Sequence, residues 1–441
     1  MSDDTIFALS SGNVPSGVAI IRLSGPKVRF AFETMIGFLP PARKAVLAEL
    51  KDGSDKILDQ AIVLFFEGPR SFTGEDCGEF HVHGSRAVLN VVLSELSHFD
   101  GFRLAEAGEF SRRAFENGRL DLTEIEGLSD LILANTEQQR VLAQKQTSGK
   151  LRALYDDWRN RLINLRAHIE ADLDFSEEED IPDDVNRHLI DGVGGLITDI
   201  TAHIDSFVKG EIIREGFKVS LVGAPNSGKS SLLNALAKRD VAIVSEYKGT
   251  TRDIISISLN LDGFEVVISD TAGIRDTDDV VERIGIDRAI DSGRDANLTL
   301  FLQSSDQEPW NQSDLEDMFG DNVEIIYSKA DLLSNKNIGD NSIYVSSISQ
   351  AGLKDLEQLI SIRARNSIGN GNQLFLTRMR HKLLLEKSLF HLNSILNDNE
   401  MLIELISEEL RLASDQLGRI IGKVDVEDLL DAVFSEFCVG K

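Results

Sequence analysis

The sequence predicts a multidomain chain of the α/β and all-α classes. A small N-terminal α/β domain is followed by a helical bundle, and a doubly wound α/β domain is inserted into that bundle. Three observations lead to this prediction: short strands separated by turns come first, strands alternate with helices in the middle, and helical apolar patterns flank that middle segment on both sides. The length of 441 residues also exceeds what one hydrophobic core usually supports.

Residues 1–118 are predicted to form the N-terminal domain, because turn signals such as Asp52-Gly53 separate its apolar runs. Strands are expected at Val18–Leu23, Ala45–Leu50, Asp59–Phe66 and Glu79–His83. His81 and His83 share one face of the last strand, since side chains alternate along a strand. No Cys or carboxylate cluster at ligand spacing accompanies them, which favours surface or subunit-contact histidines over a metal site.

Residues 119–209 are predicted to be the first part of the helical domain. The segment Thr123-Glu124-Ile125-Glu126 matches a capping box, and apolar residues recur at helical spacing from Ile125 through Ile169. Residues 374–441 form the second part, with helices from about Leu374 to Phe437. Their apolar stripes most simply pack against the first part, so that two separated stretches build one bundle.

Residues 210–365 are predicted to be the inserted domain. Ile255–Leu261 and Phe264–Ile268 form a hairpin across Asp262-Gly263, a dipeptide that tight hairpins prefer. The segment Ala364–Gln373 is rich in Asn and Gly and indicates a linker.

Residues 223–230 read Gly-Ala-Pro-Asn-Ser-Gly-Lys-Ser and satisfy the phosphate-loop pattern G-x-x-x-x-G-K-[ST]. A buried strand precedes the loop and a helix follows it, which is the context that the motif requires and which disfavours a chance Gly-rich turn. Lys229 is expected to reach the outer phosphates and Ser230 to bind Mg²⁺ through its hydroxyl. The nucleotide contacts expected here are Asn226, Ser227, Gly228, Lys229, Ser230 and Ser231.

Two later segments indicate which nucleotide binds. Ser328-Lys329-Ala330-Asp331 is close to the guanine-reading pattern N-K-x-D, and Asp331 would accept from the guanine N1–H and 2-amino groups, which adenine does not offer in that arrangement. Ser328 stands where Asn is usual, a departure that bears on affinity and base selectivity. Tyr344-Val345-Ser346-Ser347-Ile348 resembles the loop that backs the guanine ring, with Ser346 and Ser347 as contacts. GTP is therefore favoured over ATP.

The segment Asp270-Thr271-Ala272-Gly273 follows an apolar strand, where the Asp270 carboxylate can hold Mg²⁺ through water. Gly249-Thr250-Thr251-Arg252-Asp253 resembles a first switch loop, with Thr251 as the second hydroxyl on Mg²⁺. Ile274 occupies the position at which Ras-like GTPases carry the Gln that orients water. Glu282 is the candidate for that task, and a solvated helix carboxylate is the alternative.

The side-chain oxygen of Asn226 is expected to help coordinate K⁺ beside the β- and γ-phosphates. Such a cation would replace the charge of an arginine finger, which is worth ~10³ to 10⁵ in rate. Ser245, Tyr247 and Thr250 complete the expected K⁺ site, while Arg252 and Arg275 leave an arginine-based mechanism open. Nucleotide contacts are expected along this whole segment, at Ser245, Glu246, Tyr247, Lys248, Gly249, Thr250 and Thr251.

Composition limits the classes of function. No basic, apolar leader opens the chain and no apolar run approaches the ~18 residues of a membrane span, so a cytoplasmic protein is expected. Cys77 and Cys438 are too few for a disulfide scaffold and are compatible with a reducing compartment. A net charge of −27 opposes unaided binding to a polyanion, so any work on nucleic acid requires a local basic patch or a basic partner.

Six further segments stand out across nearly the whole chain: Asp4-Thr5-Ile6-Phe7-Ala8, Ile20-Ile21-Arg22-Leu23-Ser24-Gly25, Phe72-Thr73-Gly74-Glu75-Asp76, Gly108-Glu109-Phe110-Ser111-Arg112-Arg113-Ala114-Phe115, Asn117-Gly118-Arg119-Leu120-Asp121-Leu122 and Cys438-Val439-Gly440-Lys441. Together with the nucleotide motifs, they resemble the MnmE (TrmE) family of tRNA-modification GTPases. The resemblance implies that the N-terminal domain is folate-binding-like and that the inserted domain is a Ras-like GTPase domain.

The resemblance also implies a homodimer through the N-terminal domains, with a tetrahydrofolate derivative, in its 5,10-methylene or 5-formyl form, as one-carbon donor. The family's folate-contacting positions correspond to Arg22, Glu79, Arg119 and Lys441. A carboxylate suits the N–H donors of a pterin, and Arg or Lys suits the glutamate tail; Arg119 stands where the family has Lys. Surface ion pairs are the alternative. Cys438 either takes part in chemistry or is a contacting thiol.

By the same resemblance, the chain works with an FAD-containing partner of the MnmG (GidA) type, in a heterotetramer or larger complex. The complex would add an aminomethyl or carboxymethylaminomethyl group to carbon 5 of the wobble uridine of certain tRNAs, with GTP hydrolysis driving a conformational change. Two alternatives stay open. One is a regulatory GTPase switch that acts on ribosome assembly or signalling without covalent chemistry, and the other is a folate-dependent one-carbon transferase regulated by its GTPase domain.

Overall fold

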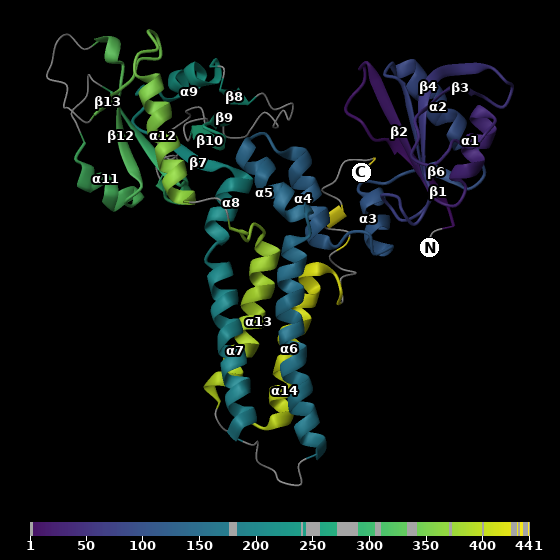
Figure 1. Ribbon diagram of the computed structural model, residues 1–441. Coiled ribbons are helices and arrows are strands. Elements are labelled where there is room, and N and C mark those ends of the chain that lie inside the picture. Colours follow the sequence, from purple (N-terminus) through teal and green to yellow (C-terminus); the bar gives the residue numbers. More distant parts are fainter. Residues whose placement is uncertain are drawn as a thin grey trace, which may run out of the picture. The chain divides into compact units, whose positions relative to one another are not determined.

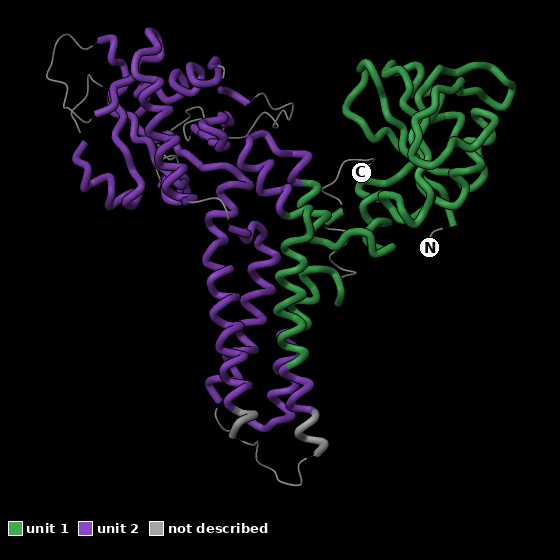
Figure 2. Tube along the Cα trace, in the orientation of Figure 1, with its two compact units in different colours: residues 1–129, 146–164, 414–441 green, residues 130–145, 165–413 purple. Residues whose placement is uncertain are grey.

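The computed structural model describes residues 3–175, 183–239, 241–243, 256–270, 290–304, 310–332, 342–369, 373–398, 401–424, 430, 433–434 and 440. Figure 1 shows the elements, and Figure 2 shows that the chain divides into two compact units. Unit 1 contains residues 1–129, 146–164 and 414–441, and unit 2 contains residues 130–145 and 165–413. The limits of the predicted segments, 1–118, 119–209, 210–365 and 374–441, differ from these units and stay a prediction.

The N-terminal domain is built on a six-stranded sheet of order β3-β4-β5-β2-β1-β6. The strands are β1 (Thr5–Leu9), β2 (Val18–Ser24), β3 (Val46–Lys51), β4 (Ile57–Phe66), β5 (Cys77–His83) and β6 (Phe102–Leu104). The four predicted strands correspond to β2 through β5. Strands β1 and β6, which pair with each other in parallel at one edge of the sheet, were not predicted from the sequence.

Helices α1 (Val28–Ile36) and α2 (Arg86–Ser97) cover the same face of this sheet, because both contribute buried side chains to one core. Phe32 and Val92 are fully buried there together with Phe80 of β5. The alternating side chains of β3 and β4 leave Leu47 and Ile62 exposed on the opposite face, which these helices do not cover.

A buried ion-pair network ties the start of β1 to α3 (Glu109–Glu116). Arg113 is 3% exposed, and its guanidinium lies 2.6 Å from Asp4 Oδ1, 3.2 Å from Glu75 Oε2 and 3.1 Å from Glu109 Oε1. Burial would raise the pKa of the Glu109 carboxyl, but hydrogen bonds from Arg103, the Glu106 backbone and Arg113 hold it below its usual value. Asp4, Glu75, Glu109 and Arg113 all belong to segments that carry the family resemblance, and here they hold the domain together.

The helical pattern after residue 121 is divided among α4 (Leu122–Leu133), α5 (Glu137–Thr147) and α6 (Lys150–Phe175). The predicted capping box at Thr123 is wrong by two residues. Asp121 caps α4, because its Oδ1 accepts from the backbone N–H groups of Thr123 at 2.7 Å and Glu124 at 2.9 Å. Glu124 Oε2 accepts in return from Asp121 N at 2.9 Å, so the reciprocal pair begins at Asp121.

The bundle joins α6 to α7 (Asp183–Ile204), α13 (Met379–Asn397) and α14 (Ile403–Ile421), as Figure 1 shows. Within unit 2, Gly192 of α7 packs so closely on Leu165 of α6 that an added Cβ would lie 2.8 Å from its Cδ2. On the other pair of helices, His391 Nδ1 of α13 lies 2.7 Å from Glu409 Oε2 of α14. Two stretches that are far apart in sequence thus build one bundle, as the fold class predicts.

The inserted domain contains a seven-stranded sheet of order β13-β12-β11-β7-β10-β9-β8. Its strands are β7 (Phe217–Val222), β8 (Ala242–Ile243), β9 (Ser256–Leu261), β10 (Phe264–Asp270), β11 (Leu298–Ser304), β12 (Val323–Ser328) and β13 (Ile343–Tyr344). Pairing is parallel except at β9, which lies antiparallel to both β10 and β8. The chain enters this domain through α8 (Phe207–Glu215).

Helices cover both faces of this sheet, as a doubly wound fold requires. Leu221 of β7 packs in one core with α9 (Lys229–Ala237) and α12 (Leu353–Ile368). The next residue, Val222, packs in a second core with α11 (Gln312–Phe319), because successive side chains of a strand point to opposite faces. A single 3₁₀ turn, η1 (Ala330–Leu332), follows β12.

The predicted hairpin is confirmed and the predicted linker is partly wrong. Asp262 and Gly263 connect β9 to β10 with φ of 51° and 87°, the two positive values that a type I′ turn needs. The Asn- and Gly-rich segment that begins at Ala364 is helical up to Ile368. Ala364 and Ile368, four residues apart, are both buried and extend the apolar stripe of α12. Among the described residues, no helix is long and apolar enough to cross a membrane.

Candidate functional site

The phosphate loop connects β7 to α9 and depends on residues with unusual backbone angles. Gly223 has φ of 146°, and a Cβ there would lie 2.6 Å from Leu302 O on the neighbouring strand β11. Gly228 has φ of 99°, and Asn226 adopts φ of 62° at the exposed tip of the loop. A side chain at either glycine would strain the loop, so the glycines of the motif are explained by backbone geometry.

Lys229 begins α9 and is only 7% exposed. Its Nζ donates to Gly223 O at 2.8 Å and to Ala224 O at 3.0 Å, so the ammonium group is held against the loop. Burial lowers the pKa of Lys229, and the negative charge of Asp270 opposes that shift. A cation in this position can interact with phosphate oxygens that the loop binds.

Ser230 and Asp270 meet at the carboxyl end of the parallel strands. Ser230 Oγ donates to Asp270 Oδ2 at 2.7 Å, and Asp270 is 2% exposed at the end of β10. Strand β10 runs parallel to β7, which brings Asp270 beside the residues that enter the loop. A hydroxyl and a carboxylate are the hard oxygen ligands that suit Mg²⁺, so the two residues that the sequence assigned to this ion are brought together.

Asp331 and Ser346 form the predicted base-reading end of the site. Ser346 Oγ donates to the exposed Asp331 at 2.6 Å, and Ser347 follows in the same loop. This loop is shaped by Gly352, whose φ is 74° and whose Cβ would lie 1.8 Å from Tyr344 O.

Ser328 makes a contact that its sequence pattern does not predict. It lies at the end of β12, and its Oγ donates to Ser227 O of the phosphate loop at 2.6 Å. No local pattern could reveal this bond, because the two residues are 101 positions apart and meet only when β12 and β7 lie in one sheet.

Much of the predicted catalytic apparatus lies outside the described residues. This holds for the candidate water-positioning group, both arginines of the alternative mechanism, most of the expected cation site, the nucleotide contacts after Asp270, the candidate catalytic Cys438 and one predicted folate contact, Lys441. These residues are Glu282, Arg252, Arg275, Ser245, Glu246, Tyr247, Lys248, Gly249, Thr250, Thr251, Thr271, Ala272, Gly273, Cys438 and Lys441.

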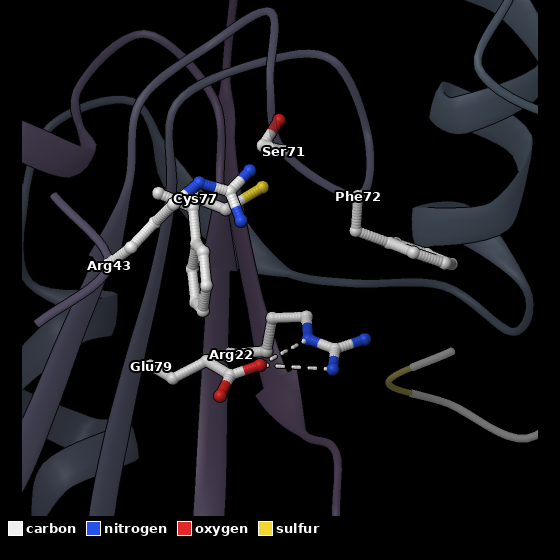
Figure 3. A pocket seen from close by; sticks show the side chains of 7 residues that line it. Arg22, Arg43, Ser71, Phe72, Cys77 and Glu79 are labelled. Carbon is white, nitrogen blue, oxygen red and sulfur yellow. Dashed lines mark hydrogen bonds and ion pairs between the residues drawn. The ribbon is translucent and has the colours of Figure 1, made fainter. Parts of the chain in front are cut away.

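A second candidate site is a cavity of about 190 Å³ on the N-terminal sheet, shown in Figure 3. Its lining consists of Arg22, Arg43, Phe66, Ser71, Phe72, Cys77 and Glu79. Arg22 and Glu79 are direct partners on β2 and β5, and the guanidinium lies 3.0 Å from Glu79 Oε1. The other carboxylate oxygen of Glu79 lies 3.0 Å from His81 Nε2.

The remaining predicted residues near this cavity have other neighbours. Arg119 is exposed and outside the lining, and its side chain packs over Gly74, where a Cβ would lie 3.2 Å from Arg119 Cγ. His83 pairs with Asp59 at 2.8 Å, and no cluster of three metal-ligating side chains occurs in the described part of the chain. Gly440 O accepts from Ser10 Oγ at 2.8 Å, which brings the C-terminal end of the chain to the end of β1.

Comparison with known proteins gives two family matches that together span most of the chain. The MnmE helical domain matches residues 122–438, and the GTP-binding protein TrmE N-terminus matches residues 5–119. A protein of Agrobacterium fabrum (strain C58) named tRNA modification GTPase MnmE is 48% identical over 441 residues, 100% of this chain and 99% of that protein. The chain belongs to the MnmE family.

A second MnmE relative, from Chelativorans sp. (strain BNC1), is 48% identical over 438 residues, 99% of this chain and 98% of that protein. Solved structures similar to this chain include the G domain of the FeoB iron transporter of T. maritima, with 23% identity, a TM-score of 0.26 and coverage of 33% of this chain and 98% of that one. A variant of Aquifex aeolicus Era bound to GDP.AlF4⁻ has 22% identity, a TM-score of 0.27 and coverage of 40% and 67%. At such low TM-scores these two structures support no argument about the site.

Proposed function

We propose that this MnmE-family GTPase hydrolyses GTP and, with an FAD-dependent partner of the MnmG type, modifies carbon 5 of the wobble uridine of certain tRNAs in the cytoplasm. The group added is aminomethyl or carboxymethylaminomethyl. The observation that supports this proposal most strongly is that the phosphate loop, the Ser230–Asp270 pair and the Asp331–Ser346 pair are built on one sheet. The chain that carries them matches MnmE relatives over its full length. The regulatory switch remains the second candidate function.

Mass spectrometry of tRNA nucleosides tests this proposal directly. A strain that lacks the gene should lose the modified wobble uridine, and the wild-type gene should restore it. Lys229→Ala should not restore it, because the ammonium group held against the phosphate loop is lost. Unchanged wobble uridines in the deletion strain would favour the switch.

Hydrolysis is proposed to use K⁺ held in part by Asn226, whose exposed position at the loop tip suits contact with an ion beside the phosphates. Rates measured in KCl and NaCl at equal ionic strength should differ by at least about tenfold, because a positive charge beside the phosphates contributes ~10³ to 10⁵ in finger-using GTPases. Asn226→Ala should reduce the KCl rate and leave the NaCl rate unchanged. Equal rates in both salts would support the arginine alternative.

The cavity of the N-terminal domain is proposed to take part of a tetrahydrofolate derivative, which supplies a one-carbon unit when bound. Its chemistry is suitable, since one carboxylate, two guanidinium groups and two aromatic rings line it. Calorimetry with 5-formyltetrahydrofolate should show at least tenfold weaker binding for Glu79→Ala, because pterin N–H donors lose their acceptor. Glu49→Ala is the matched control on the same sheet but outside the lining. Equal affinities of wild type and Glu79→Ala would reject the assignment.

A homodimer is proposed to form through the uncovered face of the N-terminal sheet. Leu47 is 64% exposed and Ile62 is 45% exposed, and they are direct partners on β3 and β4. Light scattering should show a dimer for the wild type and a monomer for Leu47→Glu, because the charge prevents burial of this apolar pair. Leu104→Glu, on β6 at the opposite edge and 58% exposed, should remain dimeric.

A further inference from the structure

The guanine site must both hold the phosphate loop and read the base, and the position of Ser328 suits only the first of these tasks. Ser328 is 4% exposed, and its hydroxyl donates to Ser227 O in the phosphate loop at 2.6 Å. Gln303 O lies farther from the same hydroxyl, at 3.4 Å. Both neighbours are backbone carbonyl oxygens, which can only accept a hydrogen bond.

A hydroxyl carries one proton, and in Ser328 that proton is used in the short bond to Ser227 O. The N7 and O6 atoms of guanine are acceptors and require a donor. The hydroxyl still has lone-pair capacity, but that edge of guanine offers no N–H group to fill it. Ser328 therefore cannot donate to N7 or O6 while it holds the loop. An Asn side chain, with two amide N–H donors, could do both.

Asp331 faces the complementary task, because its carboxylate can accept from the N1–H and 2-amino groups of guanine. The carboxylate is oriented by Ser346, which is fully buried and donates to it at 2.6 Å. Ser346 Oγ in turn accepts from the backbone N–H of Ser349 at 3.1 Å, so its own direction is fixed by the loop.

We propose that Ser328 is a positioning residue that tethers the phosphate loop, and that it leaves N7 and O6 of the base unread. Guanine selectivity in this chain then rests on Asp331 as oriented by Ser346. The proposal refines the GTP site and depends on GTP being the nucleotide bound. It predicts that affinity and base selectivity are controlled by different residues.

Equilibrium binding of GTP, 7-deaza-GTP and ITP to the full-length chain tests this separation. 7-deaza-GTP lacks the N7 acceptor, and ITP lacks the 2-amino donor. The wild type should bind GTP and 7-deaza-GTP within about twofold of each other, because no group reads N7. Ser328→Ala should weaken all three nucleotides by one common factor, roughly 2- to 13-fold for the loss of a hydrogen bond, and leave their ratios unchanged.

Two further variants should change the ratios of the nucleotide affinities instead of lowering all affinities by one factor. Ser346→Ala should reduce the preference for GTP over ITP, because the acceptor of the 2-amino group is no longer oriented. Ser328→Asn should create a preference for GTP over 7-deaza-GTP of roughly 2- to 13-fold, since the second amide N–H reaches N7. Ser367→Ala is the matched control, because this exposed serine on α12 also donates to a backbone carbonyl, Arg363 O at 3.0 Å.

A preference of the wild type for GTP over 7-deaza-GTP of more than about fivefold would overturn the proposal, whether or not Ser328→Ala folds. A change in the GTP to ITP ratio in Ser328→Ala would overturn it as well. If the wild type bound neither GTP nor 7-deaza-GTP, GTP as the ligand would fail, which is a different result from an altered ratio.

Discussion

The bond between Ser230 and Asp270 is the residue-scale feature on which the proposed Mg²⁺ site depends. A short loop motif and a strand end 40 positions away are joined by one hydrogen bond of 2.7 Å. The carboxylate is almost fully buried, so its negative charge acts in a poorly solvated place where an adjacent Mg²⁺ is strongly favoured.

Asp270→Asn should keep a hydrogen-bond acceptor for Ser230 but remove the negative charge. We expect the Mg²⁺ concentration needed for half-maximal GTP hydrolysis to rise by roughly 10- to 100-fold, in line with the loss of a supporting carboxylate at other metal sites. A Mg²⁺ titration of the hydrolysis rate measures this. Asp314→Asn, in the first turn of α11, is the control. An unchanged Mg²⁺ requirement in Asp270→Asn would contradict the assignment.

Single residues also show what the sequence could and could not predict. The phosphate loop is contiguous and chemically specific, so Lys229 and Ser230 could be assigned without coordinates. The contact of Ser328 with Ser227 depends on sheet order, which no local pattern specifies. Glu79 was assigned to pterin N–H groups, yet in the structure its two oxygens already lie beside Arg22 and His81. Its pterin contact stays a prediction, and residue type alone did not reveal its neighbours Arg22 and His81.

At the scale of elements, the hairpin of β9 and β10 connects the nucleotide site to the helical domain. Gln138 N of α5 donates to Gly263 O at 3.2 Å, and Gln139 Nε2 donates to the Glu265 carboxylate of β10. Strand β10 ends at Asp270, so the element that carries the carboxylate proposed for Mg²⁺ is bonded to α5 at its other end.

Gly263→Ala should destabilise the inserted domain by about 1–2 kcal/mol, because φ of 87° strains a residue with a Cβ. Crowding contributes little, since that Cβ would lie 3.7 Å from Glu137 Cβ, an ordinary contact. Gly263→Asn should cost less, because Asn tolerates positive φ. Denaturant unfolding of both variants measures the difference. Equal costs for Ala and Asn would show that the turn is not limited by its backbone angle.

The Arg113 network predicts a pH dependence of the N-terminal domain. Arg113→Met should lower the free energy of unfolding at pH 7 by ~3–5 kcal/mol, because it leaves buried carboxylates without their partner. The lowered pKa of Glu109 means that its charged form stabilises the fold above its ordinary value of 4.5, and that this contribution is lost as pH falls below it.

The stability difference between wild type and Arg113→Met should therefore be largest near pH 7 and shrink on acidification, as measured by unfolding at several pH values. Arg112→Met is the control, since that neighbouring arginine is more exposed and lies 3.2 Å from Glu116. A difference that stays constant as pH falls would exclude this linkage.

Element types were predicted best where turns frame a strand. The limits of strands β2 through β5 were predicted within a few residues because Gly, Pro and Asp occur in the turns between them. β1 and β6 were missed, since each is short and is stabilised by parallel pairing with a partner about 97 positions away, a long-range contact that a local pattern does not reveal. The capping box lies two residues earlier than predicted because Asp121, not Thr123, caps α4. Helix α12 continues into the segment predicted as a linker because buried Ala364 and Ile368 stabilise its last turn.

At the scale of the whole molecule, net charge limits how strongly the chain alone can bind tRNA. The net charge is −27. Phosphate contacts require Lys and Arg, and their electrostatic contribution dominates non-specific affinity. The chain alone should therefore bind tRNA weakly, and a partner with a basic surface should supply most of the contacts.

Fluorescence anisotropy with labelled tRNA tests this expectation. The chain alone should bind with a dissociation constant of roughly 10⁻⁵ M or weaker at physiological salt, and the basic partner should tighten binding and steepen its salt dependence. Submicromolar affinity of the isolated chain with a steep salt dependence would show that a basic patch on this chain overrides its net charge.

The bond between Ser10 and Gly440 spans 430 positions and lies within the first compact unit. Ser10 is therefore synthesised long before its partner, Gly440. Until Gly440 has left the ribosome, β1 can pair with its strands but cannot receive this contact. The unit therefore reaches its final arrangement only after Gly440 has been synthesised and can fold back onto Ser10.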